Sequence, residues 1–391
     1  MEIKYQGLVT LLRSAITDQR LSLPEGFDLE SVEELVKKQG LIPMAYQGAY
    51  LCGISKELPV MVRLYQKFYR IMINGERQTV AARQLLRAFE ENGIDHMPLK
   101  GCKLKGMYPK PELRQMGDAD ILIRMEQYDK ISAVMESLGY RETKESAYDR
   151  CWSSPVLYAE LHKRLFSPRQ ADLNRYFGIG WERAQQTRGS RYDMSPEDEF
   201  AYIFCHMMKH FRFCGIGARQ IVDLYVFRKA NPQMDEGRVE EIMAQLGAAE
   251  FYRNIRRLLQ VWFEGEETDD VTDYITAFIF SNGSWGSVEN KLYAEELLRA
   301  RNGVKGARRK TVLRVIFPTM ADMQLSYNTL YRHPWLYGVF WGKRIFDIAK
   351  RGPGHVSKRM TQVRQVTDEN VLAHQNAMAY MGLRFDFEEE E

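Results

Sequence analysis

The stretch that decides the fold is His96–Arg124, HMPLKGCKLKGMYPKPELRQMGDADILIR. Its pattern predicts a strand at 97–99, a tight turn at Lys100-Gly101 and a short helix over 102–108 that two prolines end. Gly117 then opens a second predicted strand, DADILI, at 118–123. The chain is therefore expected to place two aspartates at the start of an apolar strand.

Side chains of a strand alternate between its two faces, so Asp118 and Asp120 share one face with Cα atoms about 6.5–7 Å apart. Ala119, Ile121 and Ile123 point to the other face, towards a core. Like charges about 4 Å apart repel by roughly 1–4 kcal/mol, and a divalent cation removes that cost. Magnesium favours one or two carboxylates together with substrate phosphates. In the alternative interpretation, Asp118 caps a turn and Asp120 is solvated.

This segment resembles the nucleotidyltransferase superfamily that includes polymerase beta. Within it, the segment is similar to a bacterial family usually labelled uncharacterised nucleotidyltransferases. The matching residues are Leu99, Lys100, Gly101, Arg114, Gly117, Asp118 and Asp120. The turn departs from the superfamily, which more commonly has Gly-Gly or Gly-Ser where this chain has Lys100-Gly101.

The resemblance implies a third carboxylate on a neighbouring strand. VLYAELH, at 156–162, alternates like a strand and carries Glu160 about 40 residues after Asp120. Glu160-Leu161-His162 matches an acidic-Leu-His segment of the family. The alternative is a solvated glutamate on an edge strand.

Further site residues follow from the same resemblance. Lys100 or the Gly101 amide would bind the triphosphate, and Arg114 and His162 are candidates for nucleotide binding. His162 could instead orient a carboxylate or be a structural histidine. The neighbouring lysines are expected to be solvated: Lys103, Lys105 and Lys110.

A second group of candidate site residues lies on two predicted helices. The family's H-x-x-K-H pattern, followed by Arg and Asp one helix later, is matched by His206, Lys209, His210, Arg219 and Asp223, which the resemblance places in the cleft. The two histidines are at metal-binding spacing but lack a third ligand. In the alternative interpretation, His206 packs at the boundary of the helical domain and His210 caps the end of the helix. Arg219 and Asp223 are also spaced as an ordinary helical ion pair.

Composition bounds the class of protein. A chain of 391 residues exceeds the usual size of one core, so two or three subdomains are expected. The net charge of +3 does not call for a nucleic-acid or membrane partner. The sequence has no apolar run of membrane-spanning length and no signal peptide, and its five cysteines lack paired metal spacing. We expect a cytoplasmic protein with reduced thiols.

The expected fold class is α+β, with a small mixed sheet between N-terminal helices and a larger C-terminal helical region. The expected divisions are residues 1–92, 93–168, 169–352 and a tail, 353–391. Within them the patterns predict a weak strand over 140–148, a turn over 150–154 and almost wholly helical structure after 170. Separate patterns predict a helix beginning at Ser195-Pro196, helices over 311–317 and 368–381, and a solvated acidic end at 388–391.

Two functions are consistent with these features. In the first, Asp118, Asp120 and Glu160 bind Mg²⁺ or Mn²⁺, and the protein moves a nucleoside monophosphate from an NTP, with ATP favoured, to a hydroxyl or amine. The acceptor would be a small molecule, a protein side chain or an RNA end, but not an extended nucleic acid. In the second, the protein binds nucleotide or a partner without turnover.

Overall fold

The computed structural model describes residues 1–146, 148–168, 170–284, 286–299, 317–327, 329–350 and 366–383. The chain begins with the helices α1 (Ile3–Thr17), α2 (Glu33–Lys38), α3 (Ile42–Leu51) and α4 (Pro59–Glu91). The long α4 starts at Pro59 and ends just before Gly93, whose positive φ of 58° stops the helix.

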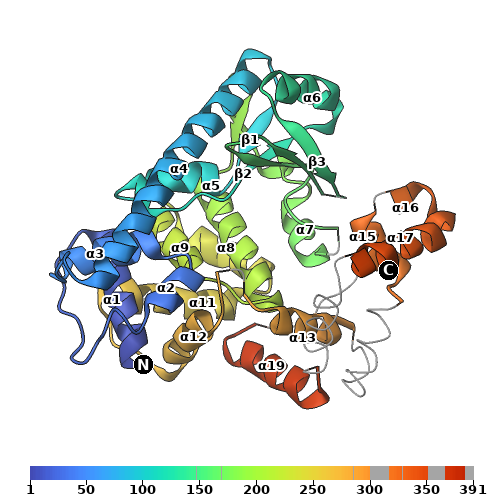
Figure 1. The fold of residues 1–391 in the computed structure, drawn as a ribbon. Coiled ribbons are helices and arrows are strands. Elements are labelled where there is room, and N and C mark those ends of the chain that lie inside the picture. The colour runs from blue at the N-terminus through green and yellow to red at the C-terminus, as the bar shows by residue number, and fades with distance from the viewer. Residues whose placement is uncertain are drawn as a thin grey trace.

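The strands in the described part of the chain form one seven-stranded mixed sheet (Figure 1). In chain order they are β1 (His96–Pro98), β2 (Ala119–Ile123), β3 (Arg141–Glu145), β4 (Asp149–Ser153), β5 (Tyr158–His162), β6 (Gln185–Arg188) and β7 (Arg191–Asp193). Their spatial order is β3-β4-β5-β2-β1-β7-β6. The α+β class predicted from the sequence is confirmed.

The sheet is buried on the face that the alternation of β2 predicts. Ala119, Ile121 and Ile123 pack in one apolar cluster with residues of α4 and of α6 (Tyr128–Ser137) (Figure 1). Leu122 points the other way and belongs to the larger core of the helical region. Asp120 shares the face of Leu122, so its carboxylate lies between the sheet and the helices beyond it.

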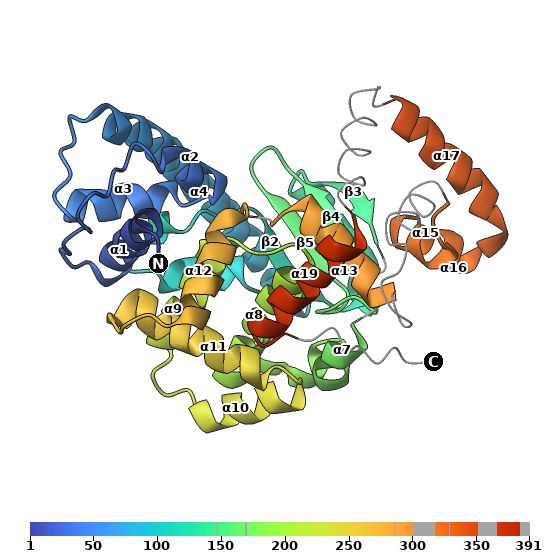
Figure 2. The same ribbon diagram turned by 90° about the horizontal axis from the view of Figure 1, so that it is seen from below.

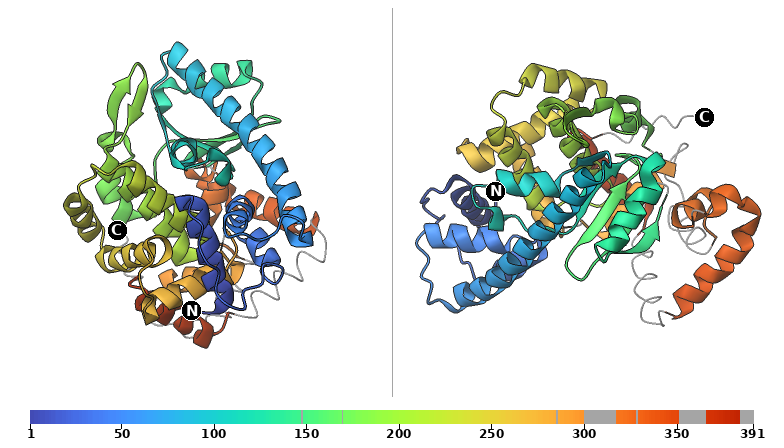
Figure 3. Two further views of the ribbon diagram at one scale, coloured as in Figure 1. Left: turned by 90° about the vertical axis from the view of Figure 1, so that its left-hand side faces the viewer. Right: turned by 90° about the horizontal axis from the view of Figure 1, so that it is seen from above.

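Two predictions about the sheet are wrong. Residues 150–154 are not a turn, because β4 occupies Asp149–Ser153 and pairs with both β3 and β5. The region after residue 170 also contains strands: the β6–β7 hairpin joins the sheet by pairing His96 with Arg191 in parallel, and it projects from the molecule in the left-hand view of Figure 3. The sheet thus continues past the expected boundary at 168.

The rest of the described chain is helical. Its helices are α7 (Ala171–Phe177), α8 (Pro196–Phe213), α9 (Ala218–Ala230), α10 (Glu236–Gln245), α11 (Ala249–Leu259), α12 (Asp270–Ser281), α13 (Val288–Arg299), α15 (Met320–Ser326), α16 (Thr329–Arg332), α17 (Tyr337–Lys350) and α19 (Asp368–Tyr380). In Figure 2 and in the right-hand view of Figure 3, α15–α17 lie on the side of the molecule opposite to α1–α3.

The helix that faces the site begins as its sequence predicts. Ser195 caps α8 by accepting a hydrogen bond from the Asp198 amide at 3.2 Å, and Pro196 follows at the first helical position. The predicted helix over 368–381 is confirmed as α19. The predicted helix over 311–317 falls almost entirely outside the described residues, and the acidic end at 388–391 lies wholly outside them.

Two further features concern the length of the helices and the state of the cysteines. Each described helix is too short or too polar to span a bilayer. All five cysteines are free thiols.

Candidate active site

The Lys100-Gly101 turn connects β1 to the short helix α5 (Gly101–Leu104) and lies directly beside β2. The Leu99 amide donates a hydrogen bond to the Asp120 carbonyl at 2.9 Å, which fixes the turn against the aspartate strand. Lys100 has φ of 33° and ψ of −104°. Such a backbone is strained for a residue that carries a Cβ.

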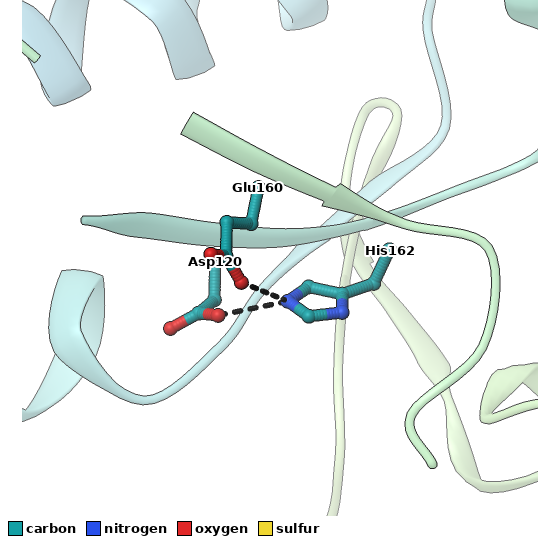
Figure 4. Close-up of side chains that lie close together, drawn as sticks. All are labelled: Asp120, Glu160 and His162. Carbon is teal, nitrogen blue, oxygen red and sulfur yellow. Dashed lines mark hydrogen bonds and ion pairs between the residues drawn. The ribbon is translucent and has the colours of Figure 1, made fainter. Parts of the chain in front are cut away.

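Asp120 and Glu160 face one another across two neighbouring parallel strands. The β2–β5 register pairs Asp120 with Glu160 and Leu122 with His162. Because side chains two residues apart share a face, all three polar side chains meet on one side of the sheet (Figure 4). His162 Nε2 lies 2.8 Å from Asp120 Oδ1 and 3.8 Å from Glu160 Oε2.

Neither solvated alternative describes these two carboxylates. Asp120 is only 4% exposed. Glu160 is on β5, which lies inside the sheet between β4 and β2 and is not an edge strand. Burial, and then the nearby Asp120 carboxylate, raise the pKa of Glu160 above its ordinary value.

Asp118 stands just before β2 and is half-buried. Burial and then the Asp120 carboxylate raise its pKa, so the two carboxylates are close enough to repel. The Asp118 side chain makes no hydrogen bond or ion pair with other described residues, so it does not cap a turn there. It lies outside the group of ligand atoms formed by Asp120, Glu160 and His162.

The donor atoms fit a divalent cation. Within the described ranges, the one group of three potential metal ligands is Asp120, Glu160 and His162, whose ligand atoms lie within 4.8 Å of one another. The two carboxylates suit Mg²⁺ or Mn²⁺, whereas an imidazole ligand is more typical of later transition metals such as Zn²⁺. His162 Nε2 donates its hydrogen to the Asp120 carboxylate, which can only accept, and the buried His162 Nδ1 has no hydrogen-bond partner among the described residues.

Lys100 is held between the carboxylates and α8. Its Nζ lies 3.1 Å from Asp120 Oδ1 and donates a hydrogen bond to His206 Nε2, also at 3.1 Å. Burial acts to raise the pKa of Asp120, but Lys100 and His162 outweigh it and hold this carboxyl below its ordinary pKa. The sheet and the helical region are therefore joined electrostatically at the candidate site.

The face of α8 that carries His206 also carries Lys209 and His210, as the spacing predicts. Burial and then nearby cations lower the pKa values: Lys209 to about 8, His210 to about 3, and His206 well below its ordinary value. Both histidines are thus neutral at pH 7, and His210 does not act as a cationic cap. The Lys209 side chain makes no hydrogen bond or ion pair with the other residues that the structure describes.

The Arg114 guanidinium forms its hydrogen bonds with another side chain of the protein. Its Nε and Nη2 donate to Asp223 Oδ1 and Oδ2 at 2.7 and 3.0 Å, and Tyr108 donates its hydroxyl to the same Oδ1 at 2.7 Å. Asp223 therefore pairs with Arg114 and not with Arg219, which donates to the Gln115 carbonyl at 3.0 Å. The alternative interpretation, an ordinary helical ion pair between Arg219 and Asp223, is therefore wrong.

Two of the three neighbouring lysines are not solvated. Lys103 pairs with Asp193 at 2.9 Å and Glu199 at 2.5 Å. Lys105 is 6% exposed and donates to the Gly75 carbonyl and the Thr79 hydroxyl. Lys110 is the most exposed of the three, with 38% of its side chain accessible, and it pairs with Asp18.

Tyr202 is a site residue that the sequence reasoning missed. It lies one turn before His206 on α8, its ring is 6.3 Å from the His206 ring, and its buried hydroxyl has no hydrogen-bond partner in the described structure. Its interaction with Lys100 acts to lower its pKa, although burial raises the pKa overall. The spacing of four residues from His206 is the signal that indicates this position.

Comparison with protein families agrees with this arrangement. The family model described as "Uncharacterised nucleotidyltransferase" matches residues 25–264, a range that contains the whole sheet, α8 and α9. The chain belongs to this family, which supports nucleotidyl transfer as its general activity. No curated protein and no solved structure matches the chain.

Proposed function

We propose that this protein is a polymerase-beta-like nucleotidyltransferase that uses a divalent cation. It would transfer a nucleoside monophosphate from an NTP to a hydroxyl or amine acceptor and release pyrophosphate. The observation that carries the proposal is the register of Asp120 and Glu160 on parallel neighbouring strands, with His162 within reach of both.

Asp118, Asp120 and Glu160 would hold Mg²⁺ or Mn²⁺. A bound cation would stabilise the charge that develops on the α-phosphate and on the leaving pyrophosphate. His162 would hold Asp120 in place through its Nε2 or bind Mn²⁺ itself. Asp118 would complete the set from its position just before β2, where its carboxylate has no partner among the described residues.

Glu160 is the proposed general base. Its raised pKa makes it a better proton acceptor than an ordinary glutamate, and its side chain is 28% exposed, which leaves a path to the acceptor. The acceptor oxygen or nitrogen would form a bond to the α-phosphorus, and its proton would pass to Glu160. The bond from the α-phosphorus to the oxygen bridging to the β-phosphate would break, so pyrophosphate leaves with that oxygen.

The triphosphate would lie towards α8. Lys100 and the Gly101 amide are beside the carboxylates, and Lys209 offers a cation that no described residue neutralises. His206 and His210, both neutral, would contribute hydrogen bonds and shape, and Arg219 a further positive charge. Arg114 would act indirectly by holding the loop before β2 against α9 through Asp223.

The helical region would bind the acceptor, which is a small molecule, a protein side chain or an RNA end. The net charge of +3 disfavours an extended nucleic acid, because such binding depends on many phosphate contacts. A cytoplasmic location would supply nucleotides and the reducing conditions in which five free cysteines persist.

The test is to follow the label of α-labelled and γ-labelled NTPs, ATP first, with Mg²⁺ or Mn²⁺ and a panel of acceptors. We expect the α-label to enter the acceptor and the γ-label to appear in pyrophosphate. Glu160→Gln should abolish transfer, whereas Glu136→Gln, on the exposed surface of α6, should not. No product from any acceptor, with nucleotide still bound, would instead support the non-catalytic alternative.

A further inference from the structure

One carboxylate oxygen of Asp120 already interacts with two nitrogen atoms of the protein. Asp120 Oδ1 lies 3.1 Å from Lys100 Nζ and 2.8 Å from His162 Nε2. The Lys100 side chain is 16% exposed and that of Asp120 5%, so water screens this pair only weakly. A metal ion that binds Asp120 must therefore displace the Lys100 ammonium or share the carboxylate with it.

The backbone at Lys100 indicates that this side chain contributes something specific. Among the described residues, Asp18 and Lys100 are the only non-glycine residues with positive φ. A backbone of this kind disfavours any residue with a Cβ and is relieved by glycine. This chain keeps a lysine there, and the lysine directs an ammonium onto the metal-binding carboxylate.

His206 gives the ammonium a second partner. The Lys100 ammonium donates to His206 Nε2 at 3.1 Å, and the imidazole can accept because burial keeps it neutral. If Lys100 leaves Asp120, it keeps one hydrogen bond and needs only one new anionic partner. A β- or γ-phosphate oxygen would be such a partner, since a lysine ammonium binds phosphate as a point charge.

We infer that Lys100 closes the metal site in the nucleotide-free protein and that an incoming polyphosphate draws it away from Asp120. Metal alone then binds weakly, because it competes with an internal cation for the same oxygen. Nucleotide and metal enter together, each favouring the state that the other needs. The inference rests on the proposed function, because it assigns both a metal and a nucleotide to this site.

The experiment is a titration of Mn²⁺ without nucleotide, followed by the loss of the free-ion signal in electron paramagnetic resonance. Lys100→Gly removes the ammonium and the backbone strain together, and Lys100→Met removes the ammonium while keeping an unbranched side chain. We expect both variants to bind Mn²⁺ at least about tenfold more tightly than the wild type, because the competing partner of a buried carboxylate is gone. Lys110→Ala is the matched control, since it removes an exposed charge of the same segment, and it should leave the affinity unchanged.

The wild-type protein supplies the second half of the test. A non-hydrolysable ATP analogue should strengthen Mn²⁺ binding by more in the wild type than in Lys100→Gly, by a factor within the roughly 5–150-fold range of coupled sites. Unchanged or weaker Mn²⁺ affinity in folded Lys100→Gly and Lys100→Met overturns the inference. That result leaves the proposed function standing if α-label transfer occurs, whereas Mn²⁺ binding to none of the proteins contradicts both.

Discussion

Arg114 and Asp223 are 109 residues apart in the sequence, yet the guanidinium of one donates two hydrogen bonds to the carboxylate of the other. Both side chains are more than nine-tenths buried. The pair ties the loop that leads into β2 to α9. A residue that the sequence pattern placed among the nucleotide ligands is thus engaged in joining two parts of the fold.

Arg114→Ala should lower the free energy of unfolding by about 3–5 kcal/mol, because it leaves the buried Asp223 carboxylate without its cation. Arg219→Ala is the control, since Arg219 makes one hydrogen bond to the Gln115 carbonyl, and it should cost only about 1 kcal/mol. Urea denaturation measures both. Weaker nucleotide binding by Arg114→Ala at unchanged stability would show that the guanidinium binds nucleotide after all.

Gly101→Ala should separate a ligand role from a structural one. A Cβ at Gly101 would meet the Asp118 carbonyl at 3.4 Å and Arg114 Nη1 at 3.5 Å, which is ordinary contact. Stability should therefore change by less than about 1 kcal/mol. If the Gly101 amide approaches the triphosphate, the added methyl group should weaken nucleotide binding.

Gly106→Ala is the control, because a Cβ there has no neighbour within 4 Å in the described structure. Melting temperature and nucleotide titration check both variants. Equal nucleotide affinity in Gly101→Ala and the wild type would remove Gly101 from the phosphate site.

The backbone strain at Lys100 predicts which of two variants at this position is more stable. Lys100→Gly and Lys100→Ala both lack the ammonium, but only glycine relieves the positive φ of 33°. The glycine variant should be more stable by about 1–2 kcal/mol. The same pair of changes at Lys103, within α5, should give the reverse order by up to about 1 kcal/mol, since glycine is unfavourable inside a helix. Alanine equal to or better than glycine at position 100 would contradict a strained turn.

Lys209 predicts the pH dependence of nucleotide binding. Burial and then Lys100 lower its pKa to about 8 in the free protein, and only the protonated form attracts phosphate. Affinity should therefore be highest below pH 8 and decrease as the pH rises through that value. Lys209→Arg should bind without this decrease, because a guanidinium stays charged, and Lys209→Met should bind weakly throughout. The same pH dependence in Lys209→Arg as in the wild type would assign the titration to another group.

The parts of the fold that local patterns control could be predicted from the sequence. Ala119, Ile121 and Ile123 alternate with Asp120 because one face of β2 is buried against helices, and the register follows from that alternation. Ser195 and Pro196 mark the start of α8 through their own backbone chemistry.

The wrong predictions concern residues whose structure or burial depends on contacts with other secondary-structure elements. The predicted turn at 150–154 is a strand because β4 pairs with β3 and β5 on its two sides, and Arg150 forms ion pairs with Glu142 and Glu145 of β3. Lys103 and Lys105 look solvated until Glu199 and Thr79 are brought beside them. No local pattern reveals such contacts, because a spacing in the sequence carries no information about a charge that arrives from another element.

The central claim is that carboxylates from β2 and β5 bind a cation together with the phosphates of a nucleotide. Pulsed electron paramagnetic resonance of Mn²⁺ bound with a non-hydrolysable ATP analogue tests it most directly, because it reports which nuclei lie next to the metal. We predict phosphorus coupling in the wild type and its loss in Asp120→Asn and Glu160→Gln, with Glu136→Gln unchanged. Phosphorus coupling of equal strength in all four proteins would place the cation elsewhere and contradict the account.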